Sequence, residues 1–261
     1  MGILTALWRL MVFVAILIVG VVRVWLAGKK MGRNGISEAA WVINWMAKTA
    51  MKHVFGMTFS FDKPEIFMNH HGFVFPNHVS FVDIVVMLSL LPMRFLSKEE
   101  IRKWLVIGWL AESMGTVFVK RESKDSRAEA REQLGKVALY PSVVLYPEGK
   151  INHEGKELLL PFRLGAFEIA VQHHIPILPC VILYEKPEYV HWGDESIIQA
   201  GWRLFTHRTV HHVRVVPLHV IHPTGQDDSR QLAITTHASM LGILSGLGHE
   251  DEILLPDFFE E

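Results

Sequence analysis

After residue 61 the sequence alternates between short runs rich in β-branched and aromatic residues and longer runs with helical spacing. We predict strands at residues 73–75, 94–96, 116–119, 142–146, 177–184 and 213–220. We predict helices at residues 80–91, 99–114, 126–140, 164–173 and 227–247. This alternation predicts an α/β fold in which a mixed, largely parallel sheet is flanked by helices. In such a fold, reactive side chains lie in the loops beyond the strand ends.

The composition is that of a chain with a large apolar core. Of the 261 residues, 50% are hydrophobic and 20% are charged, which excludes a disordered chain. The formal net charge is −1, so no global field favours a nucleic-acid partner. The single cysteine, Cys180, excludes an internal disulfide, and its apolar surroundings in sequence indicate a buried strand residue.

The first 27 residues form an apolar stretch that Arg9 and Arg23 interrupt. The residues between the two arginines are too few to cross a hydrocarbon core of about 30 Å as a helix. The whole stretch can span the bilayer if both arginines reach outward; otherwise it lies in one leaflet. Trp8 and Trp25 lie near its ends, as is typical of rings at the level of the lipid head groups.

A second helix is predicted from Ser37, a suitable N-cap, to about residue 55. One of its faces mixes tryptophans with lysines, which suits a membrane interface, although an ordinary core helix with solvated lysines fits too. We therefore predict membrane-attachment helices over residues 1–58 and an α/β domain over residues 59–261. Lys29, Lys30 and Arg33 follow the apolar stretch. If the stretch spans, they place the domain on the cytoplasmic face of a membrane, and we expect the bacterial inner membrane or the endoplasmic reticulum.

The first candidate site is the segment from Asn77 to Asp83, directly after a predicted strand. An imidazole has an ordinary pKa of about 6.5, so His78 is suited to accept a proton from a hydroxyl near neutral pH. A carboxylate on its other nitrogen, from Asp83, would fix the tautomer and stabilise the imidazolium. A purely structural interpretation is also open, because Ser80 to Asp83 has the pattern of a helix capping box.

Three further clusters fall at predicted strand ends. Gly115 precedes a strand that ends in Lys120 and Arg121, where an arginine can grip a phosphate or remain solvated. Glu148, Gly149 and Lys150 follow another strand in a tight turn. Residues 175–179 form a strand entry with a proline at each side.

The order and spacing of these clusters resemble those of the phospholipid acyltransferase family, which contains the lysophosphatidic acid acyltransferases. The family's Asn-His-x-Ser-x-x-Asp motif matches residues 77–83, and its Gly-x-x-Phe-(Ile/Val)-x-Arg motif matches residues 115–121. Its Phe-Pro-Glu-Gly-Thr-Arg motif is met by residues 146–151, and its Val-Pro-Ile-x-Pro motif by residues 175–179. Residues 160–167 are similar to the stretch that joins the last two motifs.

The match fails after Glu148 and Gly149, where the family has Thr-Arg and this chain has Lys150-Ile151. In the family that arginine is thought to hold the phosphate of the acceptor. Lys150 supplies a point charge without the two-pronged geometry, and Lys156 and Arg163 are further cations nearby. Lys98 matches a lysine of family members, but it also reads as a solvated residue beside two glutamates. The substitution therefore leaves the acceptor head group open.

The resemblance implies an O-acyltransferase of phospholipid biosynthesis, with His78 and Asp83 as catalytic residues. Acyl-CoA or acyl carrier protein would donate the acyl group to a lysolipid hydroxyl, most simply that of 1-acylglycerol-3-phosphate, with no other cofactor and no metal. The implied substrate-binding residues are Asn77, Lys98, Gly115, Arg121, Glu148, Gly149 and Lys150. The partners are then a lipid membrane, the lysolipid and the acyl donor, without nucleic acid.

Three alternatives stay open at this point. The acceptor can be another lysolipid, with a choline, ethanolamine or ornithine head group. The chain can be a non-enzymatic membrane adaptor with the same fold, which would bind lipid without transfer. It can also be a metal-dependent esterase in which His71, His78 and Asp83 hold the ion, and a chelator would then stop activity.

Overall fold

The computed structural model describes residues 2–119, 131–152, 157–193, 195–206 and 211–246. Over these residues the chain forms a seven-stranded sheet in the order β1-β7-β6-β2-β5-β3-β4. The strands are β1 Met57–Phe61, β2 Phe73–Pro76, β3 Arg94–Lys98, β4 Val117–Val119, β5 Val143–Val144, β6 Ile177–Tyr184 and β7 His211–Pro217. Among the strand pairs that the structure describes, only β6 and β7 run antiparallel. The predicted mixed, largely parallel α/β sheet is thus confirmed.

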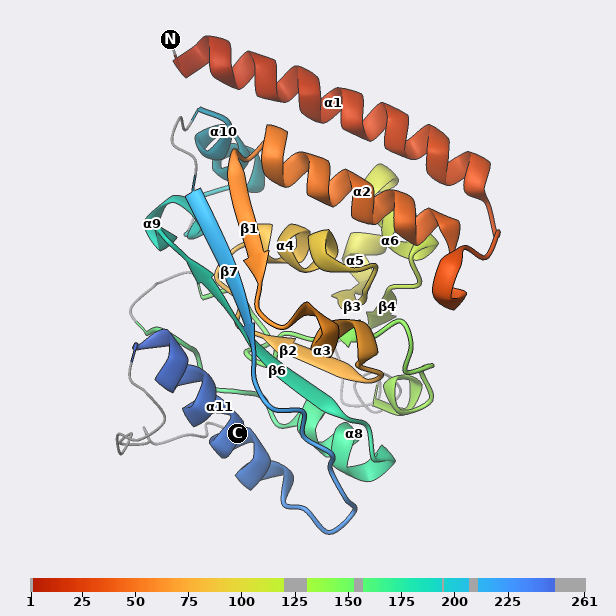
Figure 1. The fold of residues 1–261 in the computed structure, drawn as a ribbon, viewed down its shortest axis with the longest axis vertical. Coiled ribbons are helices and arrows are strands. Elements are labelled where there is room, and N and C mark those ends of the chain that lie inside the picture. The colour runs from red at the N-terminus through yellow and green to blue at the C-terminus, as the bar shows by residue number, and fades with distance from the viewer. Residues whose placement is uncertain (1, 120–130, 153–156, 194, 207–210, 247–261) are drawn as a thin grey trace.

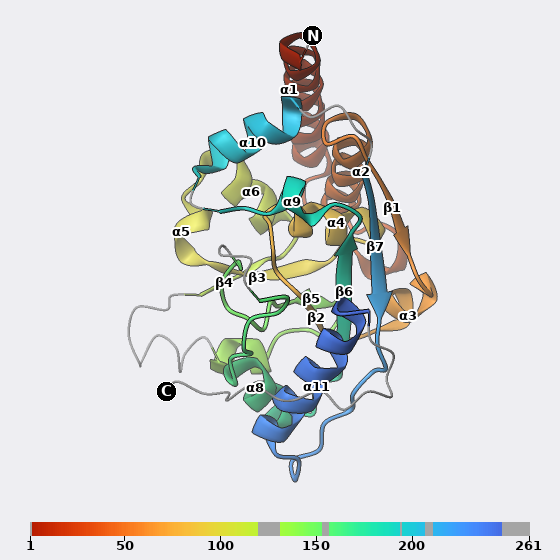
Figure 2. The ribbon, with the colours of Figure 1, turned by 90° about the vertical axis from the view of Figure 1, so that its left-hand side faces the viewer.

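Helices cover both faces of the sheet (Figure 1). On one side lie α1 Gly2–Ala27, α2 Glu38–His53, α4 Val82–Leu90, α6 Leu105–Ser113 and α10 Ile197–Thr206, whereas α8 Gly165–His173 and α11 Ser229–Leu244 lie on the other. The remaining named helices are α3 Pro64–Asn69, α5 Glu99–Arg102, α9 Pro187–Val190 and a short 3-10 turn at Arg33–Gly35. The view from the side shows α1 and α10 together at one end of the molecule (Figure 2).

The central strands are apolar on both faces because helices cover both. In β2, Phe73 and Phe75 belong to the core beneath α8 and α11, while Val74 between them faces the α2–α4 side. Alternate side chains of a strand point to opposite faces, so one short strand serves two cores. This double burial fixes the register of β2, since a slip by one residue would exchange the two faces.

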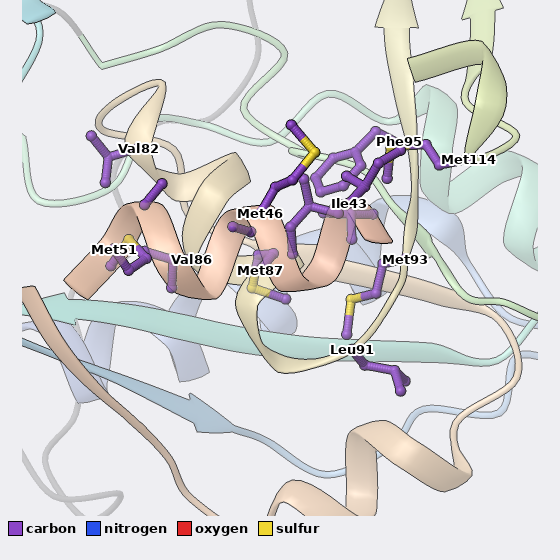
Figure 3. Packing of buried hydrophobic residues seen from close by; sticks show 14 of the residues in the cluster. Ile43, Met46, Met51, Val82, Val86, Met87, Leu91, Met93, Phe95 and Met114 are labelled. Carbon is purple, nitrogen blue, oxygen red and sulfur yellow. The ribbon is translucent and has the colours of Figure 1, made fainter. Parts of the chain in front are cut away.

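The α2 helix packs directly on α4 over the sheet. Ser37 caps α2 as predicted, with Oγ accepting from the amide of Ala40 at 3.2 Å. Buried methionines of both helices belong to this core, among them Met51 of α2 and Met87 of α4 (Figure 3). Flexible thioethers fill irregular gaps between helices well. The division of the chain at residues 58 and 59 stays a prediction.

Several elements differ from the sequence predictions. Strand β1 was missed, because five residues after an apolar helix carry little signal and its partner β7 lies about 150 residues further on. The predicted helix 99–114 is two helices, and a Cβ at Gly108 would lie 2.2 Å from the carbonyl oxygen of Arg102. Glycine thus lets α6 begin against the end of α5. The amphipathic helix α10 was also missed. Of the predicted helix 126–140, residues 131–135 are helical and residues 126–130 lie outside the described part.

Candidate active site

His78 and Asp83 meet where β2 ends and α4 begins. Nδ1 of His78 lies 2.9 Å from Oδ2 of Asp83, whose side chain is 0% exposed, against 11% for the histidine. The same Oδ2 accepts from the amides of Val79 at 2.8 Å and Ser80 at 2.9 Å. The loop therefore folds around the carboxylate, which explains how a spacing of five residues brings the two side chains together. Asp83 thus holds the amides that lead into α4 and orients the histidine with the same carboxylate oxygen.

Tyr184, at the end of β6, completes the surroundings of Asp83. Its hydroxyl donates to Oδ1 of Asp83 at 2.6 Å, so each carboxylate oxygen is held by a separate set of donors. Burial raises the pKa of Tyr184 well above its ordinary value, and the nearby Asp83 raises it further, so the hydroxyl keeps its proton. No local pattern in the sequence points to this residue, since its place depends on the register of β6 against β2.

Asn77 holds β6 in register with β2 directly beside His78. Its amide side chain donates to the carbonyl of Ile182 at 3.2 Å and accepts from the amide of the same residue at 2.7 Å. Both groups are buried, so the pair closes the ladder between β2 and β6 just beyond Pro76. Asn77 thus fixes His78, its neighbour in sequence, relative to Tyr184, two residues after Ile182.

The ring of Tyr146 stacks on the imidazole of His78. The ring centroids are 3.8 Å apart and the planes are inclined by 17°. Tyr146 follows β5, the neighbour of β2, and stands where the acyltransferase motif has phenylalanine. Its hydroxyl is buried without a hydrogen-bond partner among the described residues. Burial, followed by the charge of Asp83, raises the pKa of Tyr146 well above its ordinary value.

The side chain of Glu148 supports the loop that carries His78 by accepting from backbone amides. One carboxylate oxygen accepts from the amide of His78 at 2.6 Å and the other from the amide of Leu160 at 2.9 Å. The side chain is buried, and this burial raises the pKa of Glu148 to about 8 despite the two amides, which lower it. The carboxylate of Glu148 thus holds the backbone at His78, and its role in substrate binding stays a prediction.

Gly149 forms the turn that follows, with φ of +71°, a conformation that favours glycine. A Cβ at this position would lie 2.7 Å from Cδ and Nε of Arg163, so the arginine side chain crosses directly over the turn. The amide of Arg163 also donates to the carbonyl of Pro147 at 2.8 Å. The structure therefore brings a guanidinium to the turn in which Ile151 replaces the family's arginine.

The remaining predicted residues lie further from the pair. Lys98 is exposed at the carboxyl end of β3, where it is the N-cap of α5, and Lys150 is exposed after the turn. Gly115, with φ of +82°, precedes β4 and lies against Arg94, so the structure places it at the amino end of the strands, away from His78. Arg121 lies outside the described residues.

The side chains of Cys180 and His71 both pack against other parts of the protein. Cys180 is fully buried in β6, as expected, and burial raises the pKa of its thiol well above the ordinary value. The ring of His71 packs on Tyr140, with centroids 4.6 Å apart. Over the described part of the chain, no group of three or more His, Cys, Asp or Glu side chains is arranged to hold a metal ion.

The arrangement is suited to take a proton from an alcohol. Nδ1 of His78 is engaged with a buried carboxylate, and none of the described residues hydrogen-bonds to Nε2. Nε2 of this partly exposed side chain is therefore the nitrogen that a substrate hydroxyl can meet. The backbone amide of Trp192 donates to the carbonyl of Val79 at 3.3 Å, and that of Asn152 to the carbonyl of His78 at 2.9 Å. These bonds hold the loop in place before substrate arrives.

Comparisons with known proteins agree with this geometry. Residues 58–183 match the family model described as Acyltransferase. The lyso-ornithine lipid O-acyltransferase of Pseudomonas aeruginosa is 42% identical over 73 residues, 28% of each chain. The 1-acyl-sn-glycerol-3-phosphate acyltransferase of Neisseria gonorrhoeae is 33% identical over 103 residues, 39% of this chain and 40% of that one. The human 1-acyl-sn-glycerol-3-phosphate acyltransferase beta is 30% identical over 142 residues, 52% of this chain and 50% of that one.

The fold extends the likeness to nearly the whole chain. The crystal structure of the 1-acyl-sn-glycerophosphate acyltransferase PlsC from Thermotoga maritima superposes with a TM-score of 0.71 at 20% identity. It covers 97% of this chain and 98% of that one, including the helices before the matched segment. The curated relatives, by contrast, are matched over half of their length or less. Residues 58–183, which carry the His78–Asp83 pair, therefore belong to the acyltransferase family.

Proposed function

We propose that this protein transfers a fatty-acyl group from a thioester donor, acyl-CoA or acyl carrier protein, to the free hydroxyl of a lysolipid. The observation that carries the proposal is the 2.9 Å contact between Nδ1 of His78 and the buried carboxylate of Asp83. It leaves Nε2 as the base, and the matched family supplies the reaction class. No further cofactor is proposed.

The reaction follows from the position of that nitrogen. Nε2 of His78 accepts the hydroxyl proton while the lysolipid oxygen attacks the thioester carbonyl carbon. The tetrahedral adduct then collapses, its carbon–sulfur bond breaks, and the thiolate takes the proton back from the imidazolium. The products are the new ester and the free thiol. Asp83 stabilises the imidazolium that forms between these two proton transfers. The stacked ring of Tyr146 keeps the imidazole of His78 from rotating.

For the acceptor we propose 1-acylglycerol-3-phosphate, the substrate in the names of the Neisseria and human relatives. The phosphate of this acceptor needs a cation beside the turn after Glu148, and the apolar side chain of Ile151 cannot supply one. The guanidinium of Arg163, which crosses Gly149, supplies a planar fork at this place, and Lys150 and Lys98 add point charges.

A lyso-ornithine lipid is the second candidate acceptor. The relative with 42% identity carries that substrate in its name, and the arginine expected to grip a phosphate is absent at position 151. An ornithine head group carries a carboxylate and an amine rather than a phosphate, so it needs fewer cations.

We also propose that the enzyme sits in one leaflet of a membrane, with its domain on the cytoplasmic face, where both acyl donors occur. Helix α1 is long and apolar enough to cross a bilayer and is mostly not buried in the protein. Arg9, however, points into the protein, where it donates to the carbonyls of Leu204 and Phe205 at 3.1 and 3.3 Å. This contact ties α1 along the domain, which favours a helix lying in the interface. Two exposed apolar side chains at the starts of α6 and α10 add to this surface, Leu105 at 91% exposure and Ile198 at 80%.

The test is transfer of a labelled acyl group from acyl-CoA, or from acyl carrier protein, to a panel of lysolipids, with product masses measured. The proposal expects phosphatidic acid as the main product from 1-acylglycerol-3-phosphate. Preferential acylation of lyso-ornithine lipid would support the second acceptor. Binding of lysolipids without any transfer would overturn the enzymatic function in favour of an adaptor.

A further inference from the structure

A wide hollow lies between the end of α1, the turn that follows and the start of α2. Its volume is about 680 Å³. Figure 1 shows this turn at one end of the α1–α2 pair. We call the hollow the head-group groove, and it is lined by Arg23, Leu26, Ala27, Lys30, Gly32, Arg33, Glu38, Trp41, Val42 and Trp45. It shares no residue with the His78 site.

The groove carries more positive than negative charge. Three of its side chains are cationic, Arg23, Lys30 and Arg33, against the one carboxylate of Glu38. All four are exposed, and within the described ranges none of the three cations forms an ion pair with a carboxylate. Unpaired cations that converge on one hollow favour an anionic ligand there.

Two tryptophans shape the walls of the groove together with the arginines. The guanidinium of Arg33 lies 3.9 Å from the ring centroid of Trp41, and that of Arg23 lies 4.9 Å from that of Trp45. Stacking holds each guanidinium in place and leaves its N–H edges for a ligand. Because both rings already carry a cation over one face, the groove does not favour a choline head group as its ligand.

The turn that bears the cations is built by its own backbone. The amide of Gly32 donates to the carbonyl of Ile36 at 2.8 Å, and that of Glu38 to the carbonyl of Lys30 at 3.0 Å. Asn34 and Gly35 take left-handed conformations with φ of +57° and +69°, which reverse the chain between these bonds. The cations are therefore presented from a closed turn, which reduces the entropy lost when a ligand binds.

Apolar surface borders the groove directly. Trp25 and Leu26, in the last turn of α1, are 71% and 60% exposed. A second, wholly apolar hollow of about 240 Å³ lies along the same turns, between α1 and Trp109 of α6. A ligand that places an anion among the cations thus meets hydrocarbon-like surface beside it, which fits an amphiphile better than a free ion.

We propose that the head-group groove binds the phosphate of an anionic phospholipid from the surrounding bilayer, and so fixes the α1–α2 pair at head-group level. This inference rests on the membrane seating proposed above. The head-group groove is thus a lipid site separate from the acceptor site. Lys30 and Arg33 from the turn and Arg23 from α1 bind the lipid phosphate there.

The test compares binding of the full-length protein to vesicles of phosphatidylcholine alone and to vesicles with one fifth phosphatidylglycerol. The double variant Lys30→Gln/Arg33→Gln removes two groove cations. The matched control Lys48→Gln/Lys52→Gln removes two exposed lysines of α2 that do not line the groove. We expect the groove variant to bind anionic vesicles roughly 30-fold more weakly than the wild type, and the control less than about threefold. Equal losses in the two variants would show diffuse attraction and overturn the site.

The neutral vesicles separate failure of the groove from failure of the membrane seating. If the wild type binds them and the groove variant loses nothing on anionic vesicles, the groove is wrong while the seating stands. If the wild type binds no vesicle, the seating is wrong, and the groove fails with it as a site for bilayer lipid. The charge-preserving variant Lys30→Arg should bind as the wild type does, and thermal unfolding checks that each variant folds.

A second measurement separates lipid from free anion. Short-chain dihexanoyl phosphatidylglycerol, titrated below its critical micelle concentration, should change the tryptophan fluorescence emission of the protein, because Trp41 and Trp45 line the groove. The groove variant should lose this change and the lysine control should keep it. If inorganic phosphate at the same concentration produced the full change in emission, the groove would be a site for free anions, which would contradict the lipid proposal.

Discussion

The hydroxyl of Tyr184 lies 2.6 Å from Oδ1 of Asp83, the carboxylate whose other oxygen holds the imidazole of His78. The described donors to this buried carboxylate are two backbone amides, one phenol and the imidazole. Neutral donors stabilise the charge without competing for the histidine as a lysine or arginine would. Tyr184 thus helps to determine how strongly Asp83 acts on the base.

Replacing Tyr184 by phenylalanine should slow transfer and change its pH dependence. Without the hydroxyl, Oδ1 loses a donor and the carboxylate holds the imidazolium more strongly. Because Asp83 also loses a bond that orients it, we expect kcat to fall by roughly 10- to 150-fold, which corresponds to the loss of about 1.5–3 kcal/mol for a hydrogen bond to a charged group. The acidic limb of the rate profile should move to higher pH. A purely structural role would lower kcat and leave the profile in place, and Tyr140→Phe, beside His71, serves as the control.

Two substitutions at Tyr146 should separate its ring from its hydroxyl. Tyr146→Phe keeps the stacking on His78 and removes a buried hydroxyl without a described partner, so activity should be retained. The free energy of unfolding should stay equal or rise, since an unsatisfied buried group costs about 1–3 kcal/mol. Tyr146→Ala removes the ring and should reduce kcat at least tenfold. Steady-state kinetics and chemical denaturation measure both, and a large loss in the phenylalanine variant would show a role for the hydroxyl.

Glu148 should make the stability of the protein depend on pH. Its pKa in the folded protein is about 8, above the 4.5 of an exposed glutamate, so the folded state keeps this proton over a range in which the unfolded state has lost it. Its contribution to stability is therefore full below about pH 4.5 and is lost as the pH rises through about 8.

The matching measurement is the Tm of the wild type and of Glu148→Gln between about pH 5 and pH 8. The Tm of the wild type should fall across this range by more than that of the variant. At the acidic end the variant should be the less stable, because glutamine offers one oxygen to the two amides of His78 and Leu160. Parallel curves would mean that Glu148 stays ionised in the fold.

Asn77 should matter for stability and activity together. Asn77→Ala leaves the amide and carbonyl of Ile182 without their partners, at a cost of about 1–3 kcal/mol for each buried group. A loss of about 1 kcal/mol lowers the Tm by roughly 2–4 °C in a protein of this size. Asn77→Asp keeps the acceptor but places a buried carboxylate oxygen opposite the carbonyl of Ile182, so it should not restore the Tm. Thermal unfolding and transfer rates test this, and an unchanged Tm in the alanine variant would contradict the proposed clamp.

Local patterns in the sequence predicted much of this site. The segment from Asn77 to Asp83 follows an apolar strand and opens a helix, so its place beyond the end of β2 could be inferred without coordinates. The turn at Glu148 and Gly149 was found in the same way, as was the N-cap Ser37. Each of these features depends on neighbours within a few residues.

Contacts between distant segments were beyond this kind of inference. Tyr184 reaches Asp83 across 101 residues, and its place depends on strand register rather than on spacing. Strand β1 was missed because its partner β7 is far along the chain, and Arg9 appeared free to reach outward because the carbonyls of α10 that bind it could not be foreseen. The substrate-binding roles of Lys98, Gly115, Arg121 and Lys150 stay predictions.

The central claim is that the imidazole of His78 is the base of acyl transfer, and the most direct measurement is the turnover of purified His78→Ala with labelled acyl-CoA and 1-acylglycerol-3-phosphate. The variant should keep its Tm, since His78 is partly exposed and its own side chain bonds only to Asp83 among the described residues. Its transfer rate should fall by about 100- to 10,000-fold. A folded variant with near-normal turnover would contradict the account.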